Sequence, residues 1–283
     1  MVTFVADMKR ILDYSILITT VGLMGTACEN KPAKPGNHLT DSTQENPAIT
    51  LLKEAVKQYP DSVRLYDKLI DQYTAVKNYK AAVAWCDSLL SKNEDLNYSY
   101  WFVKGDLQRQ ALQFDSAISS YKKYLQRFPD DEQVLLNLAN TAAEAGKPES
   151  LALSDELANR TGTNEIKSDA QFIKGVYYSR TGDFDKAIEH FDQTIVYRYS
   201  FWEAWLEKAM ALYDKKAYDK ALETLNKLLQ VNPSYPDAFY WLGKCYEALN
   251  NKTEALKNYE TAYGLDRTYT EAKEKMDSIK AIH

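Results

Sequence analysis

Residues 182–195, GDFDKAIEHFDQTI, combine an apolar stripe with a dense group of acids. The apolar residues fall at i, i+3, i+4, i+7 and i+11, one face of a helix: Phe184, Ala187, Ile188, Phe191 and Ile195. The ionisable residues between them are Asp183, Asp185, Glu189, His190 and Asp192. Such a group forms either a metal or acid–base site or the solvated face of an amphipathic helix, and the rest of the chain decides between them.

The stretch recurs along the chain with a constant period. Segments of the same pattern begin at residues 78, 112, 216 and 251. Aligned on one alanine of the stripe, they are separated by 35, 70, 34 and 34 residues, where 70 is two periods. The aligned residues are Ala82, Ala117, Ala187, Ala221 and Ala255. This periodicity predicts a stack of repeated two-helix units.

A second series of small residues precedes the alanines at the same spacing. Its members are Gly105, Ala139, Gly175, Ala209 and Gly243. Glycine inside a helix lowers the stability of the helix by about 1 kcal/mol relative to alanine. Because glycine recurs at the same position of the repeat, we expect two helices to approach each other closely there. Pro60, Pro129 and Pro233 each follow the second helical segment of a period. They are expected to end it, because proline lacks the N–H that continues a helix.

The pattern resembles the tetratricopeptide repeat family, in which each repeat is a helix–turn–helix. The large residue before the small one matches at Trp101, Leu135 and Trp205. The aromatic residue before the alanine matches at Tyr79, Phe114, Phe184 and Tyr218. The resemblance implies an all-α fold, a right-handed α-solenoid with a C-terminal capping helix. It divides residues 47–283 into a half repeat (47–62), six repeats (63–267) that begin near residues 63, 98, 132, 168, 202 and 236, and a cap helix (268–282).

Two repeats depart from the pattern. Ile70 stands at the small position of the first full repeat, so its two helices are expected to lie further apart. In the third repeat Leu151 replaces the alanine, with Ala152 one place late. A looser or kinked repeat is expected there, with the extra residue absorbed by a wide loop at 161–165.

Residues 1–27 are expected to be an export signal that is removed. The basic segment Met8-Lys9-Arg10 precedes an apolar stretch from Tyr14 to Met24, and small residues follow. The apolar stretch is shorter than the ~20 residues that a membrane span needs.

The end of this segment has two interpretations. Gly25-Thr26-Ala27-Cys28 resembles the lipobox of bacterial lipoproteins, although Gly25 stands where leucine is common. Ordinary cleavage after Ala27 is the alternative. Residues 28–46 are polar and hold too few apolar side chains to build a core, which favours a flexible tether after a lipidated Cys28. The prediction is a protein anchored by lipid in the bacterial cell envelope, with the outer membrane favoured and a periplasmic or surface-facing domain.

The composition argues against several functions. The net charge is −5 and the Lys and Arg residues are scattered, without the basic patch of a nucleic-acid-binding surface. No HExxH, phosphate loop, GxSxG or paired CxxC motif occurs, so no catalytic residue, metal or cofactor is predicted. Cys86 and Cys245 lie in helical patterns and are expected to be small buried residues without a disulfide.

The acids of residues 182–195 and His190 are predicted to form a solvated outer face, away from the apolar stripe. Asp185, Glu189 and Asp192 lie within ~60° of one another on a helix. Like charges at i,i+4 mildly destabilise an exposed helix unless water or a cation screens them. Because the equivalent positions of other repeats carry mixed Ser, Lys, Glu and Asn, the metal site is the less favoured alternative.

The resemblance implies that the first helix of each repeat lines a concave groove. The partner-binding candidates that it gives are Phe102, Asp106, Leu136, Asn140, Phe172, Leu206, Met210, Tyr213, Tyr240 and Lys244, with Asp67, Asp71 and Val176 at matching positions. An apolar groove with aromatics suits an amphipathic helix or an extended peptide. The alternative, that these side chains pack between neighbouring repeats, stays open residue by residue.

Three functions are compatible with this sequence. The favoured one is a non-catalytic adaptor that binds a protein or peptide in its groove. The second is a structural subunit of an outer-membrane protein assembly complex. An enzyme or glycan-binding lipoprotein is the third, and it is disfavoured because no insertion between repeats is long enough to hold a site.

Overall fold

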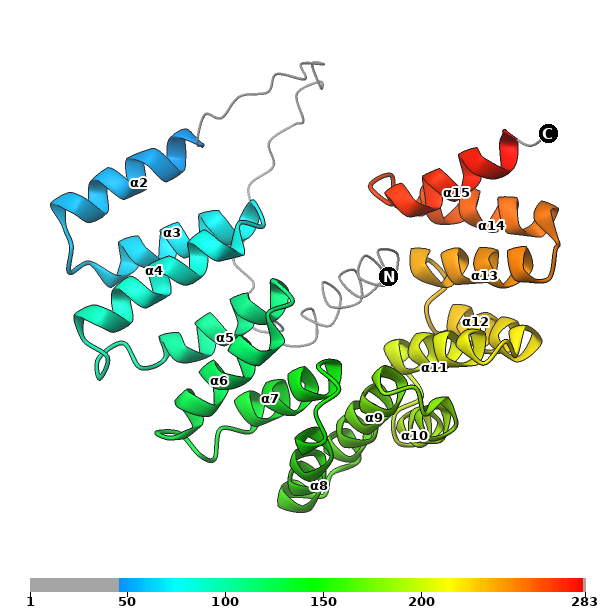
Figure 1. Cartoon of the computed structure of the whole chain (residues 1–283), viewed down its shortest axis with the longest axis horizontal. Helices are drawn as coiled ribbons and strands as arrows, with labels where there is room; N and C mark the ends of the chain where they lie inside the picture. The colour runs from blue at the N-terminus through cyan, green and yellow to red at the C-terminus, as the bar shows by residue number, and fades with distance from the viewer. Residues whose placement is uncertain (1–45, 282–283) are drawn as a thin grey trace. The chain divides into compact units, whose positions relative to one another are not determined.

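The computed structural model describes residues 46–281, and their regular structure is entirely helical (Figure 1). The chain divides into two compact units, described over residues 46–127 (the first unit) and 128–281 (the second unit). The export signal, Cys28 and the tether up to residue 45 lie outside the described residues, so those predictions stay predictions.

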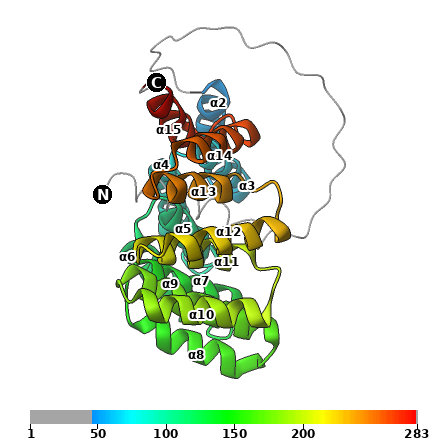
Figure 2. The ribbon, with the colours of Figure 1, turned by 90° about the vertical axis from the view of Figure 1, so that its right-hand side faces the viewer.

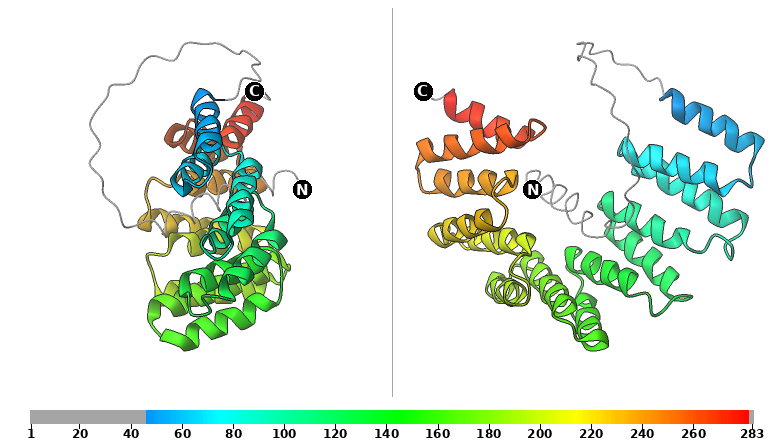
Figure 3. Two further views of the ribbon diagram at one scale, coloured as in Figure 1. Left: turned by 90° about the vertical axis from the view of Figure 1, so that its left-hand side faces the viewer. Right: turned by 180° about the vertical axis from the view of Figure 1, so that it is seen from behind.

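In each unit the helices follow one another as antiparallel pairs, and each helix packs against the next (Figures 2 and 3). The first unit contains α2 (Pro47–Gln58), α3 (Val63–Ala75), α4 (Tyr79–Lys92), α5 (Tyr100–Gln110) and α6 (Phe114–Leu125). The second unit contains α7 (Glu132–Glu144), α8 (Glu149–Thr161), α9 (Asn164–Arg180), α10 (Phe184–Tyr197), α11 (Trp202–Asp214), α12 (Tyr218–Val231), α13 (Pro236–Ala248), α14 (Lys252–Leu265) and α15 (Thr270–Lys280).

The starts of the first helices can be compared with the predicted starts of the repeats. Helices α3, α7, α11 and α13 begin at residues 63, 132, 202 and 236, as predicted, whereas α5 begins two residues late and α9, at Asn164, four residues early. Pro60, Pro129 and Pro233 follow the ends of α2, α6 and α12, as expected for residues that stop a helix. The fold is therefore an α-solenoid of helix–turn–helix repeats, with α15 in the place of the cap.

The turn inside each repeat uses one left-handed residue at a fixed position. Gly146 and Gly182 take positive φ angles of 64° and 84°. The same position is filled by non-glycine residues elsewhere: Lys77, Leu112, Lys216 and Asn250. The next residue then donates its N–H back to the carbonyl five residues earlier, as Asp183 does to Tyr178 at 2.9 Å. This bond satisfies a carbonyl at the end of the first helix and sets the entry of the second.

The predicted close approach of paired helices is confirmed at the three glycines. A Cβ on Gly105, Gly175 or Gly243 would lie 2.5–2.6 Å from the ring of Tyr121, Phe191 or Tyr259. Each of these rings belongs to the residue sixteen places later, on the second helix of the same repeat. Glycine therefore provides the space for a buried aromatic ring.

Two of the repeats without glycine carry smaller partners at the same offset. Ala209 precedes Leu225 by sixteen residues, and both are buried. Ile70 precedes Cys86 by the same number, and Cys86 is fully buried. A large residue on one helix is thus matched by a small one on the other, which accommodates Ile70 in the core.

The third repeat differs from the prediction. Neither Leu151 nor Ala152 takes the small buried position, because Ser150 is fully buried there and Ala152 is exposed. Pro148 stands where an aromatic residue begins α4, α6, α10 and α12, and α8 starts one residue later, at Glu149. Its buried Ser150 lies one residue before Leu151. The expected wide loop is also absent: α8 runs to residue 161, Gly162 takes a left-handed φ of 66°, and the Thr163 hydroxyl caps α9 at the Ile166 N–H.

Candidate partner-binding site

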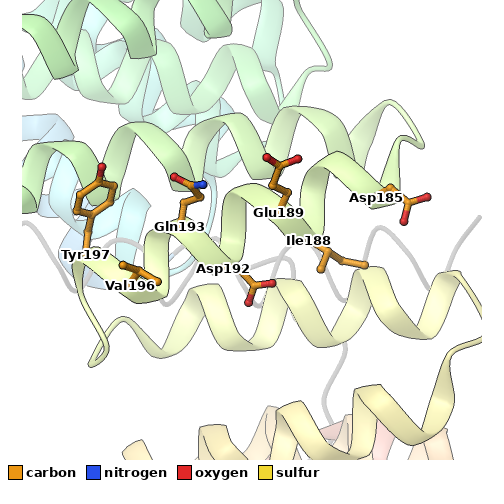
Figure 4. Close-up of a pocket in the computed structure, with 7 residues that line it drawn as sticks. All are labelled: Asp185, Ile188, Glu189, Asp192, Gln193, Val196 and Tyr197. Carbon is orange, nitrogen blue, oxygen red and sulfur yellow. The ribbon is translucent and has the colours of Figure 1, made fainter.

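Residues 182–195 form the end of a turn and most of α10. The Asp183 carboxylate caps the helix by accepting a hydrogen bond from the Lys186 N–H at 3.3 Å. Asp185 pairs with Lys215, the residue that follows α11, and Asp192 pairs with Lys208 of α11 at 2.5 Å. Asp185, Glu189 and Asp192 project from successive turns and line a surface depression made only of α10 side chains (Figure 4). They therefore form an outer face in which lysines of the next repeat screen the aspartates.

His190 does not share that solvated face, which corrects the prediction. Its ring stacks on Tyr178 of α9, with centroids 5.3 Å apart and an interplanar angle of 3°. Its Nδ1 lies 2.7 Å from the Gln171 Oε1. Burial lowers the pKa of His190, with Lys174 adding to the effect. The residue lies three places after Ala187, so it flanks the apolar stripe and contacts the first helix of its own repeat.

Cys86 and Cys245 are free and fully buried, as predicted. Burial raises the pKa of each thiol to about 12, so both stay protonated near neutral pH. Over residues 46–281, no three His, Cys, Asp or Glu side chains are grouped so that they could hold a metal ion.

We use the name first-helix face for the predicted groove positions, which lie on the first helix of each repeat. In the first unit Phe102 of α5 packs against Tyr121 and Tyr124 of α6, with ring centroids 6.3 and 5.9 Å apart. Asp106 accepts a 2.5 Å hydrogen bond from the Tyr121 hydroxyl. Both side chains are partly exposed while also holding α5 against α6.

In the second unit most apolar members of the first-helix face are packed. Leu206 and Tyr240 are 1% and 3% exposed. Met210 is also buried, and so is Val176 at a matching position. Phe172 lies between Phe191 and Phe201, with ring centroids 5.8 and 4.8 Å away. The packing alternative therefore describes these residues better than a free groove lining does.

Phe172 is nevertheless partly exposed. Four further members of the first-helix face in the second unit are partly exposed as well: Leu136, Asn140, Tyr213 and Lys244. The Asn140 Oδ1 is nevertheless buried and accepts no hydrogen bond. A buried amide oxygen that accepts no hydrogen bond carries a desolvation cost, which a donor from a bound partner would remove.

Lys244 lies within an aromatic cluster. Its Nζ is 3.6 Å from the centroid of the Trp241 ring and 5.1 Å from that of Tyr213. Tyr213 in turn packs edge-to-face on Trp241 and Tyr218. A cation over several ring faces is held by their negative quadrupoles, so the Lys244 ammonium and the Tyr213 ring present a fixed, amphipathic surface.

A buried ion triad at this face was not predicted from the sequence. The Arg180 guanidinium donates to the Glu144 carboxylate at 2.9 Å and to the Glu207 carboxylate at 3.2 Å. All three side chains are at most 6% exposed, and they come from α9, α7 and α11. Both carboxylates raise the pKa of Arg180 against the opposing effect of burial. The triad ties three successive repeats together.

A second feature that was not predicted is a row of acids at the same repeat position of the first helices α9, α11 and α13. Asp169, Glu203 and Asp237 recur at intervals of 34 residues, a signal that the repeat alignment could have revealed. Asp169 pairs with Arg198, and Asp237 accepts a 2.8 Å hydrogen bond from the Tyr269 hydroxyl. The row lies at the seams between repeats.

Comparison with known proteins agrees with the repeat geometry. Family models described as tetratricopeptide repeat match residues 102–150, 174–236 and 212–262. The chain is a tetratricopeptide repeat protein. It is similar over 82% of its length to a tetratricopeptide repeat protein from Parabacteroides merdae, with 91% of that structure covered, 15% identity and a TM-score of 0.65. It also resembles PilW, described as a type IV pilus biogenesis factor, over 76% of its length and 97% of that structure, with 20% identity and a TM-score of 0.56. At these identities the likeness concerns the fold alone.

Two curated proteins match a shorter part of this tetratricopeptide repeat protein. Anaphase-promoting complex subunit 3 of Schizosaccharomyces pombe is 29% identical over 37% of the chain, and heat shock protein STI1 of Saccharomyces cerevisiae is 32% identical over 34%. The matched segment spans only 16% and 17% of those proteins. Tetratricopeptide repeats generally act as non-catalytic scaffolds for protein partners, so the repeats indicate a protein-interaction scaffold. Among the helices of residues 46–281, none combines the length and hydropathy of a membrane span.

Proposed function

We propose that the protein is a non-catalytic adaptor of the cell envelope that binds a protein or peptide on the first-helix face of its second unit. The repeats support a protein partner. The accessible part of this face combines aliphatic, aromatic, amide and ammonium groups in Leu136, Asn140, Tyr213 and Lys244. Such a mixture suits a peptide that offers both apolar side chains and backbone hydrogen bonds.

The single observation that carries the proposal is the Asn140 amide. Its Oδ1 is buried without a hydrogen bond although the residue itself is partly exposed. Because the residue is partly exposed, a turn of its amide would bring this acceptor to a backbone N–H of a bound peptide and remove the cost of leaving it unmet.

The test is site-specific photocrosslinking in intact cells. A benzoylphenylalanine at Tyr213 should capture a partner, whereas the same residue at Tyr197, on the outer face of α10, serves as the matched control and should not. Asn140→Leu in the Tyr213 background should abolish the crosslink while leaving the thermal unfolding midpoint within a few degrees. Equal capture from both positions, or capture that survives Asn140→Leu, would refute the assignment of this face.

The envelope location rests on the lipobox-like residues that end in Cys28. We expect Cys28→Ser to move the protein from the membrane to the soluble fraction. A variant that still fractionates wholly with membranes would exclude this anchor. Stable copurification of the wild type with an integral β-barrel protein, instead of an exchanging partner, would favour the role of a structural assembly subunit.

A further inference from the structure

Helix α2 stands in the place of a second helix, but the described residues contain no first helix before it (Figure 1). Its Ala48 lies one period of 34 residues before Ala82. Ala82 and its four equivalents are 0% exposed, whereas Ala48 is exposed. The residue four places after each of these alanines is also fully buried, as Tyr121 is against Gly105. Leu52 holds that position in α2 and is partly exposed, so α2 presents the face that a first helix covers elsewhere.

This face of α2 carries a regular stripe of four accessible side chains, which we name the α2 seam. They lie at i, i+4, i+7 and i+11, within about 60° of one another on a helix: Ala48, Leu52, Ala55 and Tyr59. Leu51 borders the stripe and is 67% exposed. Ile49 and Val56 lie about 90° around the helix and are buried in the core shared with α3. The α2 seam is therefore a second apolar face, additional to the one that holds α2 on α3.

Small and large residues alternate along the α2 seam. Their spacing is that of the d and a positions of a heptad, which form the contact between two coiled helices. In an antiparallel pair of α2 helices with a two-fold axis between residues 52 and 55, Leu52 faces Ala55 of the second copy, and Tyr59 faces Ala48 of the second copy. Each large side chain thus meets a small one, so the seam is complementary to itself, as a two-fold interface requires.

Two other segments of the chain are poorer partners for the α2 seam. Residues 29–41, one period before α3, lie outside the described residues, and their sequence contains Pro32, Pro35 and Gly36, which oppose a helix. The last helix, α15, exposes only polar and charged side chains between Thr270 and Lys280. Packing the apolar seam on α15 would bury these groups without partners. The α2 helix of a second copy offers an apolar surface of matching shape.

We propose that two copies of this protein associate through their α2 helices as an antiparallel two-fold pair. The interface is the α2 seam, in which Leu52 and Tyr59 of each copy pack on alanines of the other. A helix of 12 residues is about 18 Å long, so the contact is smaller than the roughly 800 Å² per partner of stable complexes. The dimer is therefore weak and forms in a concentration-dependent way. The seam contains no residue of the first-helix face.

The test is sedimentation velocity of the full chain carrying Cys28→Ser, which removes the predicted site of lipidation. Between about 1 and about 200 µM, the range for an interface of this size, the mean mass should rise from monomer towards dimer. Ala48→Glu places a carboxylate opposite Tyr59 of the second copy and should weaken dimerisation at least about tenfold. Thr50→Glu adds the same charge at an exposed position about 160° away on α2, so it should leave dimerisation unchanged.

Disulfide trapping tests the antiparallel register in the same Cys28→Ser chain. Leu52→Cys and Ala55→Cys place thiols at facing positions, so a mixture of the two variants should form a mixed disulfide faster than either variant links to itself. The native Cys86 and Cys245 are fully buried and stay protonated, so they do not compete.

Three results would overturn the proposal. One is a dimer that persists in Ala48→Glu, which would assign self-association to another surface. Another is equal trapping in the mixture and in the single variants. The third is a chain that stays monomeric up to the highest concentration, which would leave the α2 seam to a helix of another protein.

Discussion

The two units stabilise their helix contacts with different polar chemistry. In the first unit buried tyrosines donate to aspartates: Tyr100 to Asp67, and Tyr121 to Asp106. Its ion pairs, such as Lys104 with Asp87 and Arg127 with Asp95, have exposed carboxylates. The second unit also has such bonds, from Tyr269 to Asp237 and from Tyr259 to Glu247. It differs in that the carboxylates Glu144, Glu207 and Glu203 are buried, and two of them share Arg180.

This difference predicts different responses to pH. A tyrosine hydroxyl stays neutral below its pKa, and burial beside Asp67 raises that of Tyr100. A buried carboxylate, by contrast, depends on its protonation and on one shared guanidinium. The first unit should therefore be insensitive to pH between 5 and 9, whereas the second should respond.

The largest effect is expected for Arg180→Met. The substitution leaves Glu144 and Glu207 buried without their guanidinium, and removing one partner of a buried ion pair costs about 3–5 kcal/mol. Hydrogen exchange followed by mass spectrometry should show faster exchange in α7, α9 and α11. Protection in α3–α6 should remain at the wild-type level. An equal loss of protection from exchange in both units would mean that the triad does not act locally.

The next largest effect concerns the stability of Glu203→Gln at different pH values. The folded-state pKa of about 7 exceeds the ordinary value of 4.5, so the folded protein holds this proton more tightly. The free energy of unfolding should therefore fall as the pH rises from 4.5 to 7, by up to about 3 kcal/mol, and stay level above that.

Glutamine mimics the neutral acid, so Glu203→Gln should be more stable than the wild type at pH 8 and similar to it near pH 4.5. Urea denaturation at both pH values measures the difference. The exposed control Glu189→Gln should follow the wild-type profile. If the free energy of unfolding of Glu203→Gln falls by the same amount between pH 4.5 and 7, another group causes the pH dependence.

The third prediction tests a feature that both units share. Gly105→Ala and Gly175→Ala should each destabilise the protein by about 1–3 kcal/mol, because the new methyl group would overlap the Tyr121 or Phe191 ring. Adding Phe191→Leu to Gly175→Ala should recover part of the loss, since the pair then matches Ala209 and Leu225. Thermal unfolding of Gly105→Ala, Gly175→Ala, Phe191→Leu and the double variant checks this, and additive effects in the double variant would argue against direct coupling.

The smallest effect is expected for Tyr100→Phe. It removes one hydrogen bond to Asp67, whose carboxylate remains hydrated, so a loss of about 1 kcal/mol is expected. The loss should be the same at pH 5.5 and 8.5, as measured by urea denaturation. A clear pH dependence would contradict the proposed contrast between the units.

The sequence predicted the architecture because the helix contacts recur in every repeat. The alanine and glycine series identify the contact between paired helices, and the structure confirms the steric need for Gly105, Gly175 and Gly243. The third repeat was harder, since a single proline at position 148 shifts α8 by one residue while the turn keeps its place.

The candidate site was less predictable than the fold. Helical spacing shows that Leu206 and Tyr240 share a face with Tyr213 and Lys244, but it does not show which of them the neighbouring repeat covers. The Glu144–Arg180–Glu207 triad joins residues 36 and 27 positions apart at different repeat positions, so no single alignment column reveals it. Burial and charge pairing between repeats are properties of the assembled stack.

The glycine–aromatic pairs also bear on how such a chain can evolve. Gly175 and Phe191 lie in one hairpin, as do Gly243 and Tyr259, so each hairpin carries both halves of its own steric fit. A duplication or exchange of whole hairpins preserves every such fit, whereas a crossover between the two helices separates them. The chain can therefore change length by whole repeats more readily than it can exchange single helices.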